Sequence, residues 1–65
     1  MNIIVNGERR DLAAATLAEA LAALDLAGAV VATALNGEFV PKRQRAATPL
    51  KHGDRIEIVA PRQGG

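Results

Sequence analysis

The pattern of apolar and polar residues divides this chain into segments. Some have the two-residue repeat of a β-strand, and one has the repeat of about 3.6 residues that is typical of an α-helix. At the start, a short β-branched run from Ile3 to Val5 is followed by Asn6-Gly7 and by a polar stretch that closes on Leu12. Asn-Gly between two short strands is typical of a two-residue hairpin, because both turn positions tolerate a positive φ. The N-terminal residues therefore predict a hairpin with strands at about 2–6 and 8–13.

The next segment has the period of an amphipathic helix. Apolar residues recur at i, i+3, i+4 and i+7, namely Leu17, Ala20, Leu21 and Leu24. Thr16 can cap the backbone N–H of Glu19, and Glu19 can reach back to the N–H of Thr16, which together make a capping box. Gly28 lies just past the last periodic residue, where glycine supplies a left-handed stop. We expect a helix from 17 to about 26.

A second hairpin is predicted in the middle of the chain. The apolar run from Val30 to Leu35 leads into Asn36-Gly37, and Glu38 to Val40 forms the second arm. Continuous apolar character indicates a strand in the interior of the sheet, with one face under the helix. Pro41 has no N–H to give to a ladder and ends the second arm.

The remaining residues predict a connection, a turn and a last strand. The polar connection over 41–51 has room for a short irregular strand near Ala46 and Ala47, and His52-Gly53-Asp54 is a turn. Apolar and polar residues alternate from Arg55 to Ala60, as in a half-buried strand. Two hairpins and one helix laid across a mixed sheet of four to five strands make an α+β fold in which the first and last strands pair side by side. This is the β-grasp, or ubiquitin-like, arrangement.

Composition narrows the class of protein. The 65 residues make one domain near the lower limit for independent folding, and they include no cysteine, hence no disulfide, thiolate metal site or cysteine nucleophile. A small domain without crosslinks fits a reducing cytoplasm, and we expect a cytoplasmic protein with neither a signal segment nor a membrane span. A net charge of +1 and a single aromatic residue, Phe39, argue against a nucleic-acid partner.

The residue types that carry most enzyme chemistry are sparse. Histidine occurs once, as His52 in the predicted turn, with no second histidine or thiolate to complete a metal site. Of the seven carboxylates, Glu19 is explained by helix capping and Asp54 by its turn, while the others fall at polar positions of the hairpins or the helix. We therefore predict no metal site, and a protein that is not an enzyme.

Basic residues gather in the 41–51 connection, where Lys42, Arg43, Arg45 and Lys51 stand close together in the sequence. A solvated loop explains them most simply. Lys42, Arg43 and Arg45 are also candidates for docking to an acidic protein surface, because charge complementarity speeds and orients an encounter. RNA binding ranks below both, since no aromatic residue is interleaved with these basic residues.

The chain ends on a glycine pair that the fold does not need. Pro61 closes the last strand, so we expect 1–61 to form the β-grasp domain and 62–65 a flexible tail. Because glycine has no Cβ, Gly64-Gly65 would pass through a channel too narrow for other dipeptides and approach a nucleotide closely. The α-carboxylate of Gly65 is inert until it is activated, and the chain has no phosphate-binding GxxxxGK or GxGxxG loop of its own. A separate enzyme would have to supply ATP. The glycine pair alone is also explained by a frayed terminus, and its position after the last strand of a β-grasp is what favours an activated carboxylate.

Five stretches of the sequence follow one another over nearly the whole chain: IIVNGE, TLAEAL, VATALNGEFVPK, HGDRIEIV and QGG. Together they resemble the ThiS family, the sulfur carriers of thiamine biosynthesis. The combination of ALNGEFVP, a following basic residue and GDRIEIV is more specific than the two glycines alone. The related small subunit of molybdopterin synthase shares the fold and the Gly-Gly end, but it is typically longer and differs around ALNGEFVP.

The resemblance implies a mechanism. A ThiF-type adenylating enzyme would use ATP and magnesium to convert the Gly65 carboxylate into an acyl adenylate, so that the chain itself binds no cofactor. A cysteine desulfurase or a rhodanese-like protein would then supply sulfur. The resulting Gly65 thiocarboxylate would deliver that sulfur to the thiazole synthase ThiG. Arg62, Gln63 and Gly64 would form the inserted tail, in which Gly64 gives clearance in the channel, and the exposed sheet face would dock the partners.

Three alternatives remain open. A molybdopterin-type or other biosynthetic sulfur carrier would use the same tail with different partners. A ubiquitin-like protein modifier would end in an isopeptide bond between Gly65 and a lysine. A plain β-grasp interaction or RNA-binding module would keep its function without the two glycines.

Overall fold

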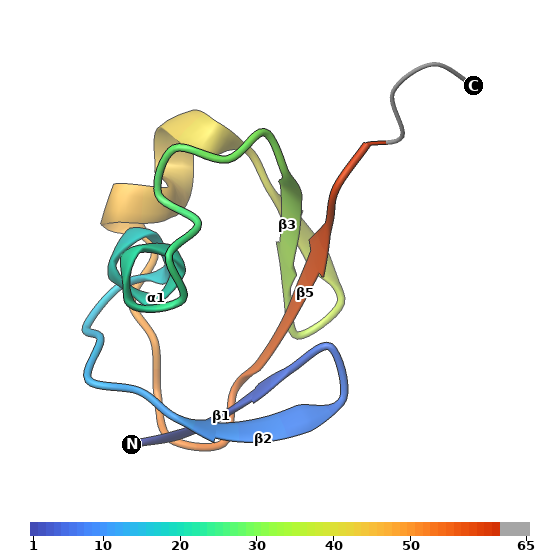
Figure 1. Ribbon diagram of the computed structural model, residues 1–65. Coiled ribbons are helices and arrows are strands. Elements are labelled where there is room, and N and C mark those ends of the chain that lie inside the picture. The colour runs from blue at the N-terminus through green and yellow to red at the C-terminus, as the bar shows by residue number, and fades with distance from the viewer. Residues whose placement is uncertain (62–65) are drawn as a thin grey trace.

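Two hairpins, one α-helix, one 3₁₀ helix and a last strand make up residues 1–61, the part of the chain that the computed structural model describes. In chain order the elements are β1 (Asn2–Val5), β2 (Glu8–Asp11), α1 (Leu17–Ala23), β3 (Ala32–Leu35), β4 (Glu38–Val40), the 3₁₀ helix η1 (Lys42–Ala47) and β5 (Arg55–Val59) (Figure 1). Neither helix of this described part is long and apolar enough to cross a membrane.

The five strands form one mixed sheet in the order β2-β1-β5-β3-β4. β5 lies at the centre, parallel to β1 and antiparallel to β3. α1 and η1 lie together on one side of the sheet (Figure 1). The first and last strands are therefore neighbours, as the sequence predicts, and the last strand runs between the two hairpins.

Both Asn-Gly pairs make the predicted two-residue turns. Asn6 and Gly7 have φ of 50° and 84°, and Asn36 and Gly37 have φ of 51° and 86°. A positive φ at both positions defines a type I′ turn, whose twist matches that of the flanking strands. The strands of the first hairpin are one to two residues shorter than predicted.

The start of α1 has the predicted cap with one difference. The Glu19 N–H donates to Thr16 Oγ1 at 3.2 Å, which confirms Thr16 as the N-cap. The Glu19 carboxylate accepts from the N–H of Ala15 at 2.9 Å, one residue earlier than the predicted N–H of Thr16. The carboxylate therefore fixes the residue before the N-cap. The flanking residues Ala15 and Leu17 form the backbone hydrogen bonds of the isolated bridge between Thr16 and Pro49.

The end of α1 differs from the prediction. Gly28 is not the left-handed residue; that position is occupied by Asp25, which has a φ of 63°. The N–H of Leu26 returns to the Leu21 carbonyl at 2.8 Å, as in a Schellman cap. Aspartate is one of the few residues whose short polar side chain tolerates this conformation. The helix accordingly ends at Ala23 instead of at about residue 26.

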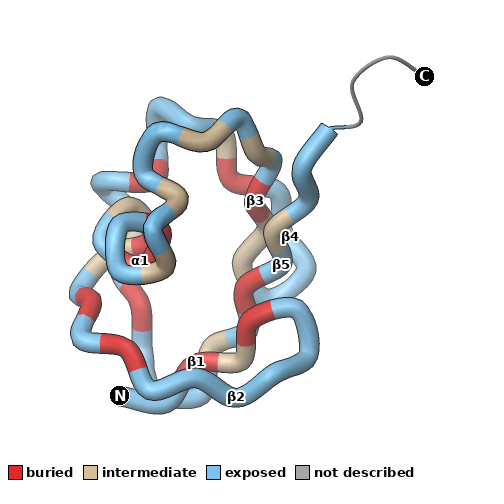
Figure 2. Tube along the Cα trace, viewed as in Figure 1, coloured by how far each residue is buried: buried red, intermediate tan, exposed pale blue. Residues whose placement is uncertain are grey.

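The core lies between the sheet and the two helices, where buried segments from both layers face each other (Figure 2). The largest fully buried side chains come from β1, α1, β3 and β5, namely Ile3, Leu17, Thr33 and Ile56. Each fully buried aliphatic side chain of this size contributes about 1.5–3 kcal/mol through removal from water. The central strand β5 is thus anchored by its own core residue, Ile56.

The irregular strand predicted near Ala46 and Ala47 is wrong, because these residues end the 3₁₀ helix η1. The segment consists of lysine, arginine, glutamine and alanine, which are good helix formers and are not β-branched. A helix therefore begins directly after Pro41. The Gln44 N–H donates to the Pro41 carbonyl at 2.9 Å. The sheet reaches five strands without this segment, within the predicted range.

The strand predicted over 30–35 begins two residues late, at Ala32. The Val31 carbonyl instead accepts a hydrogen bond from Arg45 Nη2 at 2.6 Å. Val30 is 77% exposed, so its apolar side chain does not serve the core. An apolar run therefore predicted too long a strand here, because part of the run belongs to the protein surface.

Candidate functional site

The central strand leads to the predicted reactive end of the chain. β5 is hydrogen-bonded to β1 on one side and to β3 on the other. It ends at Val59 and is followed by Ala60 and Pro61. The predicted site residues lie outside the described residues; they are Arg62, Gln63, Gly64 and Gly65. The described part of the candidate site is therefore the end of β5 and the surface around it.

The asparagine of each hairpin turn bonds to β5 through its side chain. The N–H of Ile58 donates to Asn6 Oδ1 at 2.8 Å, and Asn6 Nδ2 donates to the Ile58 carbonyl at 3.1 Å. On the other side, the N–H of Arg55 donates to Asn36 Oδ1 at 2.9 Å, and Asn36 Nδ2 donates to Asp54 Oδ1 at 3.1 Å. The Asn6 amide bonds β5 as an additional strand residue would, whereas the Asn36 amide bonds one backbone N–H of β5 and the Asp54 side chain. The sequence does not reveal these bonds, because the turn alone already explains an asparagine before glycine.

Apolar side chains are exposed around the end of β5. Val30 and Val59 are 77% and 63% exposed. With Val31, Ala32 and Pro61 they line a hollow of about 340 Å³. We call these five residues the terminal apolar patch. Exposed apolar groups that lie together mark interaction sites, so a partner that reaches the end of β5 would find surface to bury here.

The single aromatic residue lies on the outward face of the same sheet. Phe39 on β4 is 70% exposed, and it pairs with Ala34 of β3, which pairs in turn with Glu57 of β5. Its neighbour Val40 and the β3 residue Thr33 are buried, so alternation along the strands places Phe39 on the face away from α1. Aromatic residues are enriched in protein interfaces, which makes this face a candidate docking surface.

The predicted basic docking residues do not stay together. Lys42 and Arg43 are exposed on η1, whereas Arg45 is only 7% exposed. Arg45 therefore does not belong to a docking patch, because its guanidinium is turned into the protein. Because a 3₁₀ helix has three residues per turn, Lys42 and Arg45 lie on one side of η1 and line the same hollow, whereas Arg43 lies on another side.

Arg45 ties η1 to the second hairpin. Its Nε donates to Thr33 Oγ1 at 3.0 Å and its Nη2 donates to the Val31 carbonyl at 2.6 Å. The Thr33 hydroxyl in turn donates to the Val40 carbonyl at 2.8 Å. Sequence reasoning missed this network. The sequence feature that could have indicated it is Thr33, because a hydroxyl in an otherwise apolar, buried strand needs a hydrogen-bond partner.

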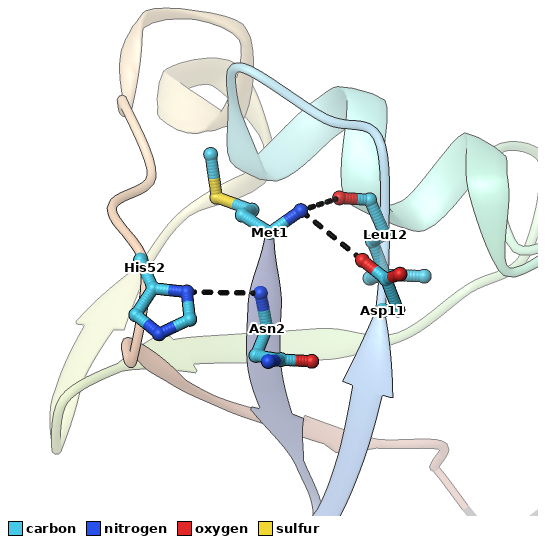
Figure 3. Close-up of polar contacts among 5 residues, drawn as sticks. All are labelled: Met1, Asn2, Asp11, Leu12 and His52. Atoms are coloured by element: carbon cyan, nitrogen blue, oxygen red, sulfur yellow. Dashed lines mark hydrogen bonds and ion pairs between the residues drawn. The ribbon is translucent and has the colours of Figure 1, made fainter.

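His52 has a structural partner at the opposite end of the sheet. Its Nδ1 accepts a hydrogen bond from the backbone N–H of Asn2 at 3.2 Å, which joins the turn before β5 to the start of β1 (Figure 3). Beside it, the Met1 ammonium donates to Asp11 Oδ1 and to the Leu12 carbonyl, both at 3.1 Å. Residues 1–61 bring together no group of three or more His, Cys, Asp or Glu side chains that could hold a metal ion.

Solved structures establish the class of protein. The chain is similar to the crystal structure of the thiamine biosynthesis protein ThiS from Geobacter metallireducens, with 36% identity, a TM-score of 0.83 and coverage of 100% of both chains. The NMR structure from the same organism gives 35% identity and a TM-score of 0.79 over 100% of this chain and 88% of that one. The predicted β-grasp, or ubiquitin-like, fold is confirmed.

Sequence comparison establishes the family. The sequence profile of the ThiS family matches residues 3–65. The chain belongs to the ThiS family of thiamine-biosynthesis sulfur carrier proteins, which are not catalysts. This confirms the family that the sequence resembles.

One curated relative is much longer than this chain. A protein of Paramagnetospirillum magneticum named thiazole synthase is 39% identical over 66 residues, which cover 100% of this chain and 20% of that protein. The chain thus spans a fifth of the length of this relative.

Proposed function

We propose that this protein carries sulfur as a thiocarboxylate at Gly65, at the end of a 62–65 tail that follows a 1–61 domain. The observation that carries the proposal is the position of β5. The last strand is the central strand of the sheet, bonded on both sides, and it runs directly to the residues before the glycine pair. Membership of a sulfur-carrier family supports the same conclusion.

Loading would take place in three steps on partner enzymes. A ThiF-type adenylating enzyme, holding ATP and magnesium, joins a Gly65 carboxylate oxygen to the α-phosphorus, and pyrophosphate leaves. A persulfide sulfur from a cysteine desulfurase or a rhodanese-like protein attacks the acyl carbon, and AMP leaves. A thiol then releases the thiocarboxylate from the acyl disulfide and forms a disulfide with the donor cysteine. The chain itself binds no cofactor in this scheme.

The acceptor of the sulfur would be the thiazole synthase ThiG. The relative named thiazole synthase supports this choice, because a segment similar to this whole chain forms part of that longer protein. A carrier and an acceptor joined in one polypeptide are held at a high effective concentration, as expected for partners in one pathway.

The docking surface would be the terminal apolar patch with Phe39 on the adjoining sheet face. Both are exposed, and both lie on the part of the sheet that includes the end of β5. Lys42 and Arg43, which are also exposed, would orient an acidic partner surface. A partner that covers the patch brings its active site near the start of the tail.

The intact mass of the protein tests this proposal. The purified chain is incubated with a ThiF-type enzyme, ATP, magnesium, a persulfide donor and a thiol reductant that releases the thiocarboxylate from the acyl disulfide. The expected result is a mass increase equal to the exchange of one oxygen for sulfur. An unchanged mass, with the same enzyme shown to load another carrier, would contradict sulfur carriage with this class of partner. A covalent adduct with a protein lysine would favour a ubiquitin-like modifier, and loading followed by transfer to a molybdopterin precursor would favour that pathway.

Substitution of Val30 by aspartate is expected to weaken binding to the ThiF-type enzyme by about tenfold or more, because it would place a charge in an apolar contact. Val30 lies outside every strand and is 77% exposed, so the free energy of unfolding should stay within about 0.5 kcal/mol of wild type. Isothermal titration calorimetry of the purified pair checks the affinity.

Ala13→Asp is the matched control for that substitution. Ala13 is also exposed, and it belongs to the segment between β2 and α1, which lies far from the end of β5 (Figure 1). The added charge is the same, and the affinity should remain at the wild-type value. Equal affinities of Val30→Asp and Ala13→Asp would show that the terminal apolar patch does not contact the ThiF-type enzyme.

A further inference from the structure

The two hairpin asparagines hold β5 at opposite ends. Asn36 bonds Arg55, the first residue of the strand, whereas Asn6 bonds Ile58, three residues before Pro61. The two residues are otherwise closely matched: each precedes glycine, their φ angles are 51° and 50°, and each makes two side-chain hydrogen bonds. They differ in position along β5 and in their partners, because Asn6 bonds two backbone groups of Ile58, whereas Asn36 bonds the N–H of Arg55 and the side chain of Asp54.

Asn6 extends the sheet beyond the end of β1. The parallel pairing of β1 with β5 ends at Val5 opposite Ile56. The Asn6 N–H still donates to the Ile56 carbonyl at 2.9 Å, and its side chain then bonds both the N–H and the carbonyl of Ile58. The side-chain amide therefore supplies the bonds to Ile58 that the backbone of a longer β1 would have supplied.

Without Asn6 the end of β5 would be bonded on one side only. On the far side, β3 continues to the pair of Ala32 with Val59. On the side that faces β1, Asn6 is the last residue in the described part of the chain that hydrogen-bonds to β5. Backbone segments with few protected hydrogen bonds open locally at low free energy, so loss of this amide would allow the end of β5 to fray.

We propose that Asn6 is a positioning residue for the chemistry at Gly65: by holding Ile58 it keeps the base of the C-terminal tail in a fixed place on the sheet. The inference rests on the proposed function, since it concerns the presentation of Gly65 to the adenylating enzyme. The reacting carbon belongs to the residue seven positions beyond Ile58. Each residue that frays adds conformations that the enzyme has to restrict when the tail enters its site.

The effect of Asn6 is therefore on the binding of the carrier and leaves the chemical step unchanged. The frayed strand end is ordered again once the carrier is bound, so the acyl carbon meets ATP in the same geometry. Loss of the amide should raise the KM for the carrier and leave kcat unchanged.

Asn6→Gly and Asn36→Gly form the test pair. Glycine accepts the positive φ of each turn and removes both side-chain bonds, so both variants keep a type I′ hairpin. The kcat and KM of the ThiF-type enzyme are measured with each full-length carrier from the release of pyrophosphate. Hydrogen exchange at the Val59 amide is measured on each free protein, and unfolding by denaturant gives the global stability.

Asn6→Gly is expected to raise KM by about three- to tenfold with kcat within about twofold of wild type, and to accelerate exchange at Val59 by a similar factor. Asn36→Gly should leave the KM and the Val59 exchange rate within about twofold of wild type, even at equal loss of global stability. A merely structural role would change the two variants alike.

Equal KM values for the two variants, or a fall in kcat alone, would overturn the proposal. Unchanged exchange at Val59 in Asn6→Gly would overturn it independently of any enzyme. If the wild-type carrier releases no pyrophosphate with an active enzyme, the proposed function fails and the role of Asn6 in it fails as well. Failure of the proposed function is seen with the wild-type carrier alone. Failure of the role of Asn6 is seen only when Asn6→Gly and Asn36→Gly are compared, so the two failures can be told apart.

Discussion

Removal of Gly64 and Gly65 is expected to abolish sulfur loading and to leave the fold intact. Two residues of extended chain span about 7 Å, so the new terminal carboxylate would fall short of the nucleotide by about that distance. The new last residue, Gln63, also carries a side chain, which a channel shaped for glycine would exclude. The buried core cluster lies between Ile3 and Ile56, so the free energy of unfolding should match that of wild type.

Intact mass in a mixed reaction measures this loss with an internal control. The truncated and full-length proteins are loaded together in one tube and differ in mass by two glycines. The full-length chain should gain the oxygen-to-sulfur difference and the truncated chain should remain unmodified. Loading of the truncated chain at the wild-type rate would show that Gly65 is not the carrier residue, and the interaction-module alternative would gain support.

Replacement of Arg45 by alanine should destabilise the domain by about 3 kcal/mol, because it removes two hydrogen bonds of a charged donor and leaves one buried and one partly buried acceptor without that partner. The affected acceptors are the Thr33 hydroxyl oxygen and the Val31 carbonyl. For a domain of this size, such a loss lowers Tm by roughly 12–24 °C. Thermal and denaturant unfolding followed by circular dichroism measure the change.

Arg43→Ala is the matched control, because Arg43 lies on the same 3₁₀ helix and is exposed. It should change the free energy of unfolding by less than about 0.5 kcal/mol. Arg45→Lys should fall between the two, since lysine keeps the charge but lacks the planar fork that reaches both oxygens. Equal stability of the two alanine variants would assign Arg45 to the surface and restore it to the docking residues.

The elements that the sequence predicts well are those determined by neighbouring residues. Asn6-Gly7 and Asn36-Gly37 require positive φ at adjacent positions, and Thr16 caps an N–H three residues away. These signals need no knowledge of the rest of the chain. The mixed sheet then follows, because two hairpins and one helix can bury their apolar faces together in few ways.

The features that the sequence does not predict depend on contacts between distant residues. Arg45 reads as a surface charge in a basic segment, yet its partners lie 12 and 14 positions earlier in the chain. Only the packing of η1 against the second hairpin brings them within hydrogen-bond distance. Likewise, Gly28 and Asp25 both suit a left-handed helix end, and the position at which α1 stops decides between them.

The candidate site combines both kinds of information. The sequence alone points to Gly65 as the reactive residue, because a terminal glycine pair has no role in a core. It does not reveal the terminal apolar patch, since Val30 and Val31 read as part of a buried strand. That patch becomes recognisable only when β3 is seen to begin after them.

The parallel pairing of β1 with β5 also determines where the protein can be labelled. Because the two strands run in the same direction, Met1 and Pro61 lie at opposite ends of the sheet (Figure 1). The Met1 ammonium pairs with Asp11, whose side chain is 85% exposed, and such exposed ion pairs contribute only about 0–1 kcal/mol. A fluorophore attached at Met1 would therefore lie away from the end of β5, and it would affect at most the two hydrogen bonds of the Met1 ammonium, to Asp11 and to the Leu12 carbonyl. Fluorescence anisotropy of that derivative would then measure its binding to each of the two proposed partners, the adenylating enzyme and the thiazole synthase.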